Sequence, residues 1–240
     1  MCTVTYIPTG SDQSFIFTSN RDEYPYRNAN ELILEEINNK QVLYPRDEGA
    51  KGTWIAISDS DQLVCILNGA FTAHKRRNDY VKSRGIMALE MFEHISAADF
   101  LKNYNLRGIE PFTMILYDNE KLFELKWDFN LKHIRILDPN ATHLWASSTL
   151  YPDEWQEKRL KWLSDWNEKY PSIDQKAVLD YHHNAGEGNN RYDVKMYVEG
   201  IVQTTSITSI EHSPSEMKLR FENLVKDSVQ KDAILFQSKT

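Results

Sequence analysis

The sequence predicts an α+β fold in which antiparallel sheets are covered by helices. Strand-like and helix-like segments follow one another in blocks along the chain, in the order strands, helices, strands, helices, strands. This order lacks the regular strand–helix–strand alternation that is typical of parallel sheets. The composition, with 41% hydrophobic and 26% charged residues, is that of an ordinary globular protein. It excludes collagen, a coiled coil and wholesale disorder.

The first block contains two β-hairpins. Thr3–Ile7 and Ser14–Ser19 are rich in β-branched and aromatic residues, and they flank a turn segment over Pro8–Asp12. Trp54–Ile57 and Leu63–Leu67 repeat this pattern around a Ser-Asp-Ser-Asp turn. Each pair is therefore expected to form two neighbouring antiparallel strands.

The remaining elements follow from helical spacing, capping residues and further strand-like runs. Helices are expected from Ser83 to His94, after the N-cap Ser96, from Pro152 along the stripe Trp155, Trp162 and Trp166, and from a capping box of Ser172 and Gln175 to Asn184. Strands are expected at Phe112–Tyr117, Leu122–Trp127, Ile134–Leu137, His143–Ala146, Val202–Ile210 and Met217–Leu224. Because no linker or repeat divides these elements, we expect a single domain over residues 1–240.

The net charge and the cysteine content indicate which binding partners and which cellular location to expect for the protein. The formal net charge of -7 argues against nucleic acid or an anionic membrane surface as a partner. No apolar run approaches the ~20 residues of a membrane span, and the first residues lack the basic segment of a signal peptide. We therefore expect no stable membrane insertion. Cys2 and Cys65 are the only cysteines and cannot build a disulfide framework, so we expect a reducing, cytoplasmic location.

Cys2 is the main candidate for a catalytic residue. Methionine aminopeptidase removes Met1 when the second residue is small, and this would leave a thiol and a free α-amine on one residue. With a reference pKa of about 7.7–8.0, such an amine can act as the base for its own thiol near neutral pH. A thiol and a free α-amine on the same first residue are the groups that an N-terminal nucleophile hydrolase needs at the least. The alternative is a small apolar residue at the start of an edge strand.

The first hairpin brings a charged run close to this thiol. Antiparallel register places Cys2 opposite a residue between Ser19 and Arg21, next to the run Asn20-Arg21-Asp22-Glu23. A nearby guanidinium would favour the thiolate, and a carboxylate could orient the α-amine. Since neighbours on a strand point to opposite faces, either a bulge interrupts the strand here or only one of Arg21 and Asp22 serves the site. A solvated charge cluster is the alternative.

Asn68-Gly69 follows the strand-like run Leu63–Leu67. An Asn side-chain amide and the next backbone N–H can together hold an oxyanion, and Gly lets the backbone approach a substrate closely. Asn-Gly is also the commonest dipeptide of hairpin turns. The pair is therefore either an oxyanion hole or a plain turn.

Together these pieces resemble the NRDE family, also called the Transport and Golgi organisation protein 2 family. The resemblance is carried by Met1-Cys2, by Ser19-Asn20-Arg21-Asp22-Glu23-Tyr24 with Arg27, by Gly52-Thr53-Trp54-Ile55-Ala56-Ile57-Ser58 and by Asn68. Looser matches are Ser83-Arg84-Gly85, the run Phe112–Asp118 and the stretch from Ala146 through Trp155 to Lys158. The resemblance extends from residue 1 to at least residue 210.

The resemblance implies a four-layer αββα sandwich of the N-terminal nucleophile hydrolase type, similar to the choloylglycine hydrolases and penicillin V acylases. It implies Cys2 as the nucleophile, Arg21 and Asp22 beside it, and Asn68 as an oxyanion donor. The expected substrate is a small molecule with a linear, non-peptide amide bond. The residues expected to contact this substrate are Asn20, Gly69, Ser148 and Gln203.

Two positions depart from the family pattern. Ser147-Ser148 stands where members often carry Ser-Asn, and Gln203 stands where members often carry the Arg of Gly-Thr-Arg. Gln203 can still donate a hydrogen bond but supplies no charge. These departures motivate an alternative function, a non-catalytic lipid- or haem-binding or trafficking protein on the same fold. Some members of the family are linked to Golgi organisation, lipid homeostasis or haem trafficking.

The other candidates have structural interpretations. We expect His182-His183 to contact the end of a helix dipole rather than a metal, and the basic run from His74 to Arg77 to be a solvated loop. The Trp155–Trp166 stripe indicates core packing rather than a ligand platform, and Cys65 a buried, inert thiol. The sequence has no metal-ligand spacing, no Gly-rich phosphate fingerprint and no Cys-Pro haem motif, so no metal or cofactor is expected.

Overall fold

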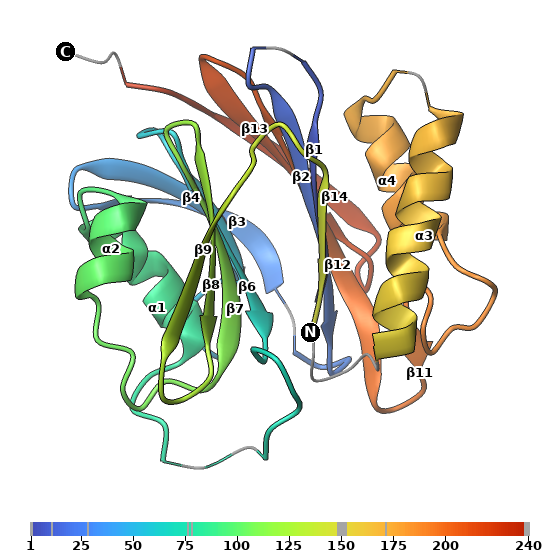
Figure 1. The fold of residues 1–240 in the computed structure, drawn as a ribbon, viewed down its shortest axis with the longest axis horizontal. Coiled ribbons are helices and arrows are strands. Elements are labelled where there is room, and N and C mark those ends of the chain that lie inside the picture. The colour runs from blue at the N-terminus through green and yellow to red at the C-terminus, as the bar shows by residue number, and fades with distance from the viewer. Residues whose placement is uncertain are drawn as a thin grey trace.

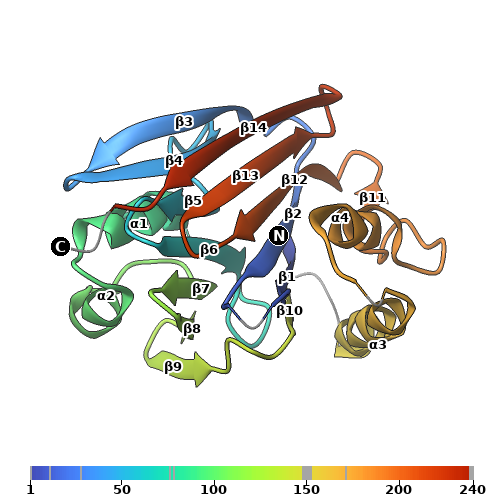
Figure 2. The same cartoon turned by 90° about the horizontal axis from the view of Figure 1, so that it is seen from above.

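Two antiparallel sheets lie face to face between two layers of helices (Figure 1). The structure is a computed structural model that describes residues 2–10, 12–27, 29–75, 77, 79–147, 153–170 and 172–237. Figure 2, seen from above, shows the same order of layers, with α1 and α2 outside one sheet and α3 and α4 outside the other. The four-layer αββα sandwich expected from the sequence is confirmed.

The first sheet, sheet A, contains Cys2 at the start of its strand β1. Its strands run in the order β10-β1-β2-β12-β13-β14, with β11 added beside β12. Their bounds are β1 Cys2–Pro8, β2 Phe15–Glu23, β10 His143–Ala146, β11 Tyr197–Val198, β12 Val202–His212, β13 Glu216–Asn223 and β14 Ser228–Leu235. Because β2 pairs with both β1 and β12, the charged run of β2 lies inside the sheet rather than at its edge.

The second sheet, sheet B, runs in chain order, β3-β4-β5-β6-β7-β8-β9. Its strands are β3 Ala29–Ile37, β4 Lys40–Asp47, β5 Ile55–Ser58, β6 Gln62–Asn68, β7 Phe112–Asp118, β8 Lys121–Trp127 and β9 Lys132–Leu137. Every neighbouring pair is antiparallel, as in a meander. Asp47 and Asn68 are therefore both strand ends of the same sheet, at the edge where the site lies.

Apolar side chains form three main layers of core. One cluster fills the space between the sheets and includes Cys2, Phe17 and Cys65. A second cluster lies between sheet B and the helices α1 (Arg84–Glu90) and α2 (Ala97–Asn103). A third joins sheet A, through residues such as Ile16, to α3 (Asp153–Lys169) and α4 (Gln175–Asn184). Burial of both faces of each sheet explains why four layers form.

The helix starts confirm the predicted cap Ser96, add Ser83 as the N-cap of α1 and correct the predicted cap of α4. The hydroxyl of Ser83 accepts a hydrogen bond from the Ile86 N–H, and that of Ser96 from the Asp99 N–H. The capping box of Ser172 and Gln175 is wrong, because the N-cap of α4 is Asp174, whose carboxylate accepts from the Ala177 N–H at 2.8 Å. A carboxylate at this position also favours the positive end of the helix dipole. Pro152, expected to open α3, lies outside the described residues.

The β3–β4 hairpin and β14 are strands that the sequence analysis did not predict. Asn38 and Asn39 connect β3 to β4 with φ angles of 50° and 62°. Two consecutive Asn residues with positive φ are typical of a two-residue hairpin turn, so this signal was present in the sequence. No helix in the described part of the chain is both long and apolar enough to cross a membrane.

Candidate active site

The β1–β2 hairpin places the chain end next to the charged run. Cys2 lies opposite Arg21, and Thr3 lies opposite Asn20. This register falls within the range expected from the sequence, and the pairing continues without interruption to Pro8 and Phe15. The thiol and the guanidinium therefore come from directly opposed residues of neighbouring strands.

Arg21 and Asp22 lie on opposite faces of sheet A. Phe17 belongs to the core between the sheets, whereas Ile16 packs against α3 and α4. Alternation along the strand then puts Arg21 on the inner face and Asp22 on the outer face. A bulge is present, but it lies in β12 between Thr204 and Ser206 and leaves β2 regular. Of the two residues, only Arg21 therefore reaches the space between the sheets.

A cavity of about 720 Å³ opens at this end of the space between the sheets. Cys2, Arg21 and Asn68 all line it, and Trp54 forms part of its wall. The structure thus brings together three of the four residues predicted to be catalytic. Asp22, Asn20, Gly69 and Gln203 are not among the described residues that line this cavity.

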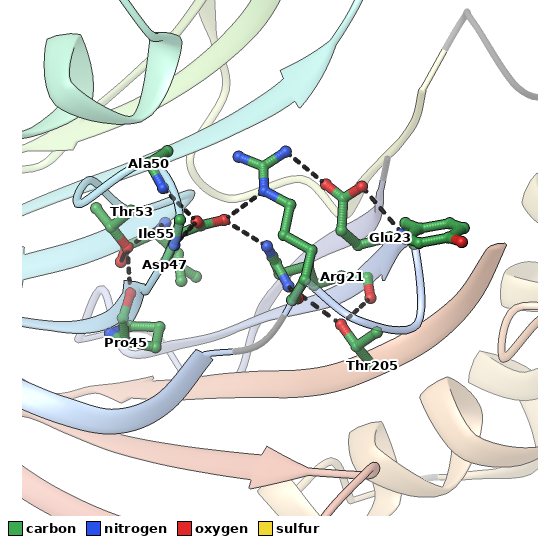
Figure 3. Close-up of polar contacts among 11 residues, drawn as sticks. Arg21, Glu23, Pro45, Asp47, Ala50, Thr53, Ile55 and Thr205 are labelled. Carbon is green, nitrogen blue, oxygen red and sulfur yellow. Dashed lines mark hydrogen bonds and ion pairs between the residues drawn. The ribbon is translucent and has the colours of Figure 1, made fainter. Parts of the chain in front are cut away.

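Arg21 is held in place by ion pairs and hydrogen bonds (Figure 3). One guanidinium nitrogen lies 2.5 Å from Asp47 Oδ2, and another donates to the Arg27 carbonyl oxygen and to Thr205 Oγ1. The guanidinium carbon lies 4.6 Å from the centre of the Trp54 ring, within the range of a cation–π contact. Burial lowers the pKa of Arg21, and the Asp47 carboxylate opposes this shift.

Asp47 is a rigid anchor for this guanidinium. Its second oxygen accepts hydrogen bonds from the backbone N–H groups of Gly49 and Ala50. Arg27 also contacts Asp47 Oδ2, at 2.9 Å, and Glu23, at 3.0 Å. The sequence analysis did not identify Asp47, because nothing in the pattern connects it to a residue 26 positions away.

The Cys2 thiol is buried, with 3% of the residue exposed. Burial raises the pKa of this thiol, the charge of Asp22 raises it further, and the charge of Arg21 opposes the rise. The thiol form is therefore favoured at neutral pH, and formation of the thiolate needs a base.

Ser147 makes two hydrogen bonds with the backbone of Cys2. Its hydroxyl oxygen accepts a hydrogen bond from the Cys2 backbone nitrogen at 3.0 Å, and its own N–H donates to the Cys2 carbonyl oxygen at 3.0 Å. Ser147 is almost fully buried. The sequence analysis chose its neighbour Ser148, which lies outside the described residues. The signal that could have indicated Ser147 is its place as the Ser of the Ser-Asn pattern.

Asn68 ends strand β6 and turns into Gly69, which has a φ of 80° that favours glycine. The Gly69 N–H donates to the Pro111 carbonyl oxygen at 3.1 Å, so this N–H already has a partner. The Gly69 carbonyl oxygen accepts from the Thr113 hydroxyl. These contacts fix the turn and leave the Asn68 side chain at the cavity wall.

The outer face of β2 carries a buried polar network. The Asn20 amide donates to the carbonyl oxygens of His182 and Val194, and its oxygen lies 2.7 Å from His182 Nδ1. His182 Nε2 lies 2.8 Å from Thr5 Oγ1, and burial lowers the pKa of His182 to about 3. The imidazole is thus neutral, and His182 lies in the last turn of α4, where it supplies no positive charge to the helix dipole. On the same face, Asp22 Oδ1 accepts from the Thr204 hydroxyl at 2.6 Å.

Two glycines of the motifs that carry the resemblance pack directly against each other. A Cβ added to Gly52 would lie 2.3 Å from the Gly85 carbonyl carbon, and one added to Gly85 would lie 2.8 Å from the Thr53 carbonyl oxygen. The Gly85 carbonyl oxygen accepts from the Thr53 N–H at 3.1 Å. This contact joins the Gly-Thr-Trp segment to the start of α1 and brings both into the cavity wall.

The remaining predicted residues lie apart from the cavity or in packed regions. Gln203 is half-buried in β12 opposite Glu23, and His183 pairs with Glu222 at 2.7 Å. Cys65 is fully buried between the sheets, and burial raises the pKa of its thiol, as expected for an inert cysteine. Trp162 and Trp166 pack into the core beneath α3, whereas Trp155 packs against a smaller cluster around Met196 and Val202 and stacks on Tyr192. No group of three or more His, Cys, Asp or Glu among the described residues could hold a metal ion.

A family model described as Transport and Golgi organisation 2 matches residues 1–214 of the chain. No curated protein sequence matches this chain.

Several solved structures share the fold. A variant of conjugated bile acid hydrolase from Clostridium perfringens has a TM-score of 0.63 at 10% identity and covers 99% of this chain and 97% of its own. Penicillin V acylase from Agrobacterium tumefaciens has a TM-score of 0.56 at 10% identity, and the match covers 96% of this chain and 85% of the acylase. The Caenorhabditis elegans ortholog of N-acylethanolamine-hydrolyzing acid amidase has a TM-score of 0.53 at 11% identity, and the match covers 87% of this chain and 92% of the ortholog. At these identities the likeness shows the fold, that of the N-terminal nucleophile hydrolases.

Proposed function

The chain belongs to the Transport and Golgi organisation 2 family, and from this premise we propose that it is an N-terminal cysteine amidohydrolase. It would cleave a linear, non-peptide amide of a small molecule through an acyl-enzyme on Cys2. The observation that carries this proposal is the shared cavity, in which Cys2, Arg21 and Asn68 converge at the open end of the space between the sheets.

The nucleophile becomes competent when Met1 is removed. Removal creates an α-amine on Cys2, and this amine is the base that the buried thiol needs. The amine takes the thiol proton as Sγ attacks the carbonyl carbon of the amide. Arg21, directly opposite, favours the negative charge on sulfur.

Ser147 holds the α-amine by a hydrogen bond, and Asp22 acts on it through its charge. The hydroxyl of Ser147 already accepts a hydrogen bond from the Cys2 nitrogen, and this contact fixes the direction in which the nitrogen lone pair can point. Asp22 lies on the other side of the strand, near enough for its charge to raise the pKa of the Cys2 thiol. Its carboxylate would favour the ammonium form and so assist proton transfer from the thiol.

Asn68 would stabilise the oxyanion of the tetrahedral intermediate. Its side-chain amide is the donor that this part of the wall offers, since the Gly69 N–H is bonded to Pro111. When the intermediate collapses, the α-ammonium gives its proton to the leaving nitrogen, and a thioester to Cys2 remains. Water, deprotonated by the same amine, then attacks the thioester, releases a carboxylic acid and restores the thiol.

The names of the structural neighbours support a small-molecule amide as the substrate class. They describe hydrolysis of a conjugated bile acid, acylase activity on penicillin V and hydrolysis of N-acylethanolamines. The proposal includes a reducing, cytoplasmic setting, because the nucleophile must remain a free thiol and both Cys2 and Cys65 are free.

The test combines intact-protein mass spectrometry with covalent labelling. We expect the purified protein to lack Met1 and to gain one acyl group from an activated acyl electrophile. Cys2→Ala should lose the label while still permitting removal of Met1, and Cys65→Ala, a matched control, should keep it. A retained Met1, or equal labelling of Cys2→Ala, would contradict the mechanism. Saturable binding of a lipid or haem by a protein that never turns over would instead favour the carrier function.

A further inference from the structure

The wall of the active-site cavity carries more positive than negative side chains. The chain as a whole has a formal charge of -7, so this surplus is local. The cationic residues of the lining are Arg21, Arg27, Arg77, Lys82 and Arg84, and the acidic ones are Glu23, Asp47 and Glu110. A cleft lined mainly by one sign of charge concentrates ligands of the opposite sign.

The three lining carboxylates are already neutralised by lining cations. Asp47 contacts both Arg21 and Arg27, and Glu23 contacts Arg27. Glu110 accepts from Arg84 at 3.0 Å, and also lies 3.1 Å from the His74 ring. A ligand in the cavity therefore meets no uncompensated carboxylate among these three residues.

Arg77, Lys82 and Arg84, which we call the cationic wall, form the side of the cavity contributed by the segment before α1. Arg77 pairs with Asp79, and Lys82 pairs with Glu90, and neither of these carboxylates belongs to the lining. The Arg77 and Lys82 side chains are 54% and 37% exposed, so both can exchange their present partners for a bound anion.

The cationic wall is physically joined to the predicted oxyanion donor. The Pro111 carbonyl oxygen accepts hydrogen bonds both from the Gly69 N–H and from Arg84. Asn68, in turn, pairs with Phe112 in the adjoining strand. Arg84 therefore lies next to the turn that carries Asn68, and both residues line the same cavity.

From this arrangement we infer that the amide substrate carries an anionic group, a carboxylate, sulfonate or phosphate, which the cationic wall binds. The inference rests on the proposed function and names the substrate class for the same site. Arg84, which is already paired with Glu110, is the member bonded next to the Asn68–Gly69 turn, and Lys82 and Arg77, whose partners lie outside the lining, supply the charge available to an anion. The anionic group positions the amide and takes no part in bond cleavage.

The experiment compares two probes that differ only in charge, N-octanoylglycine and N-octanoylglycinamide. Binding is followed by tryptophan fluorescence with the Cys2→Ala protein, because Trp54 lines the cavity. We expect the carboxylate to bind at least about tenfold more tightly at low ionic strength, and this preference to shrink with added salt. The double variant Lys82→Gln with Arg77→Gln should reduce the preference to about threefold or less.

The matched control removes two charges elsewhere, with Lys161→Gln and Lys226→Gln, both exposed and outside the lining. It should keep the full preference. Equal affinity for the two probes, failure of both to bind, or an equal loss in the control would overturn the inference. A preserved preference with no release of glycine by the unsubstituted protein would remove the proposed hydrolysis and support the ligand class alone.

Discussion

The two faces of strand β2 use the same charged sequence for different purposes. On the outer face, Asn20 makes two hydrogen-bond contacts with His182 of α4 and a third with the Val194 carbonyl oxygen, and Asp22 is bonded to Thr204. On the inner face, Arg21 is fixed by Asp47 and lines an open cavity beside Cys2. The outer residues are enclosed by protein, whereas the inner face leaves room for a ligand.

This difference shows how a short polar run inside a sheet can be both structural and functional. Buried polar groups must be hydrogen-bonded, and the outer face meets this requirement with partners from α4, from the loop after it and from β12. The inner face meets it with an ion pair that holds the guanidinium still while the thiol opposite stays at the cavity wall. The comparison predicts that substitutions on the outer face of β2 lower the stability of the protein, whereas substitutions on the inner face lower its activity.

The largest expected effect is on the inner face. Cys2→Ala should lower the rate of amide hydrolysis by at least about 10³-fold, equivalent to about 4 kcal/mol, because no other nucleophile replaces the thiol. Its urea midpoint should stay close to that of the parent, since only a sulfur atom is removed. Cys65→Ala, in the same core between the sheets but on sheet B and outside the cavity lining, should retain the activity of its folded fraction. Equal activity of the Cys2→Ala variant and the parent would contradict the assignment of the inner face to catalysis.

The next effect is on the outer face. Asn20→Ala should lower the free energy of unfolding by about 3 kcal/mol, because it leaves two buried carbonyl oxygens and an imidazole nitrogen without their partner. Urea denaturation followed by tryptophan emission measures this loss. The KM of the remaining folded enzyme should not change. A variant as stable as the parent, with a raised KM, would assign Asn20 to the substrate instead.

The buried His182 should make stability depend on pH. Its pKa is about 3 in the folded protein, against about 6.5 unfolded, so only the unfolded chain takes up a proton between these values. Stability from the neutral imidazole is therefore complete above pH 6.5 and is lost as the pH falls, by about 2 kcal/mol at pH 5. His182→Gln should be less stable at pH 7 but should lose less stability between pH 7 and pH 5. Parallel pH curves for the two proteins would contradict this assignment.

The smallest expected effect concerns Ser147. Ser147→Ala removes the acceptor that favours the ammonium form of the Cys2 amine, so the acid limb of the pH–rate profile should move to lower pH. The rate should also fall about tenfold, because the amine is less well oriented. Ser147→Thr keeps the hydroxyl and should restore both the profile and most of the rate. A tenfold loss with an unchanged profile in both variants would indicate a purely structural role.

Local sequence patterns predicted much of the fold and the centre of the site. The strand-like runs around Pro8–Asp12 led to the correct hairpin, and counting along it placed Cys2 opposite a residue between Ser19 and Arg21; in the structure this residue is Arg21. The β3–β4 hairpin was missed because β3 is mostly exposed or half-exposed and β4, although mostly buried, lacks clean alternation; the Asn38-Asn39 turn nevertheless signals the hairpin. The α4 cap was misplaced by two residues, since Ser172 and Asp174 are both good N-caps and only the packed helix decides between them.

The sequence by itself determined the properties that depend on neighbours along the chain: a small second residue, a hairpin register and a charged run on a strand. Only the tertiary structure decided which residues face one another across layers. Asp47 meets Arg21 from the other sheet, Ser147 reaches the Cys2 nitrogen from β10's end, and Gly52 packs on Gly85. The physical reason is that strand periodicity specifies a face, whereas the partner on that face is specified by how two sheets and four helices pack.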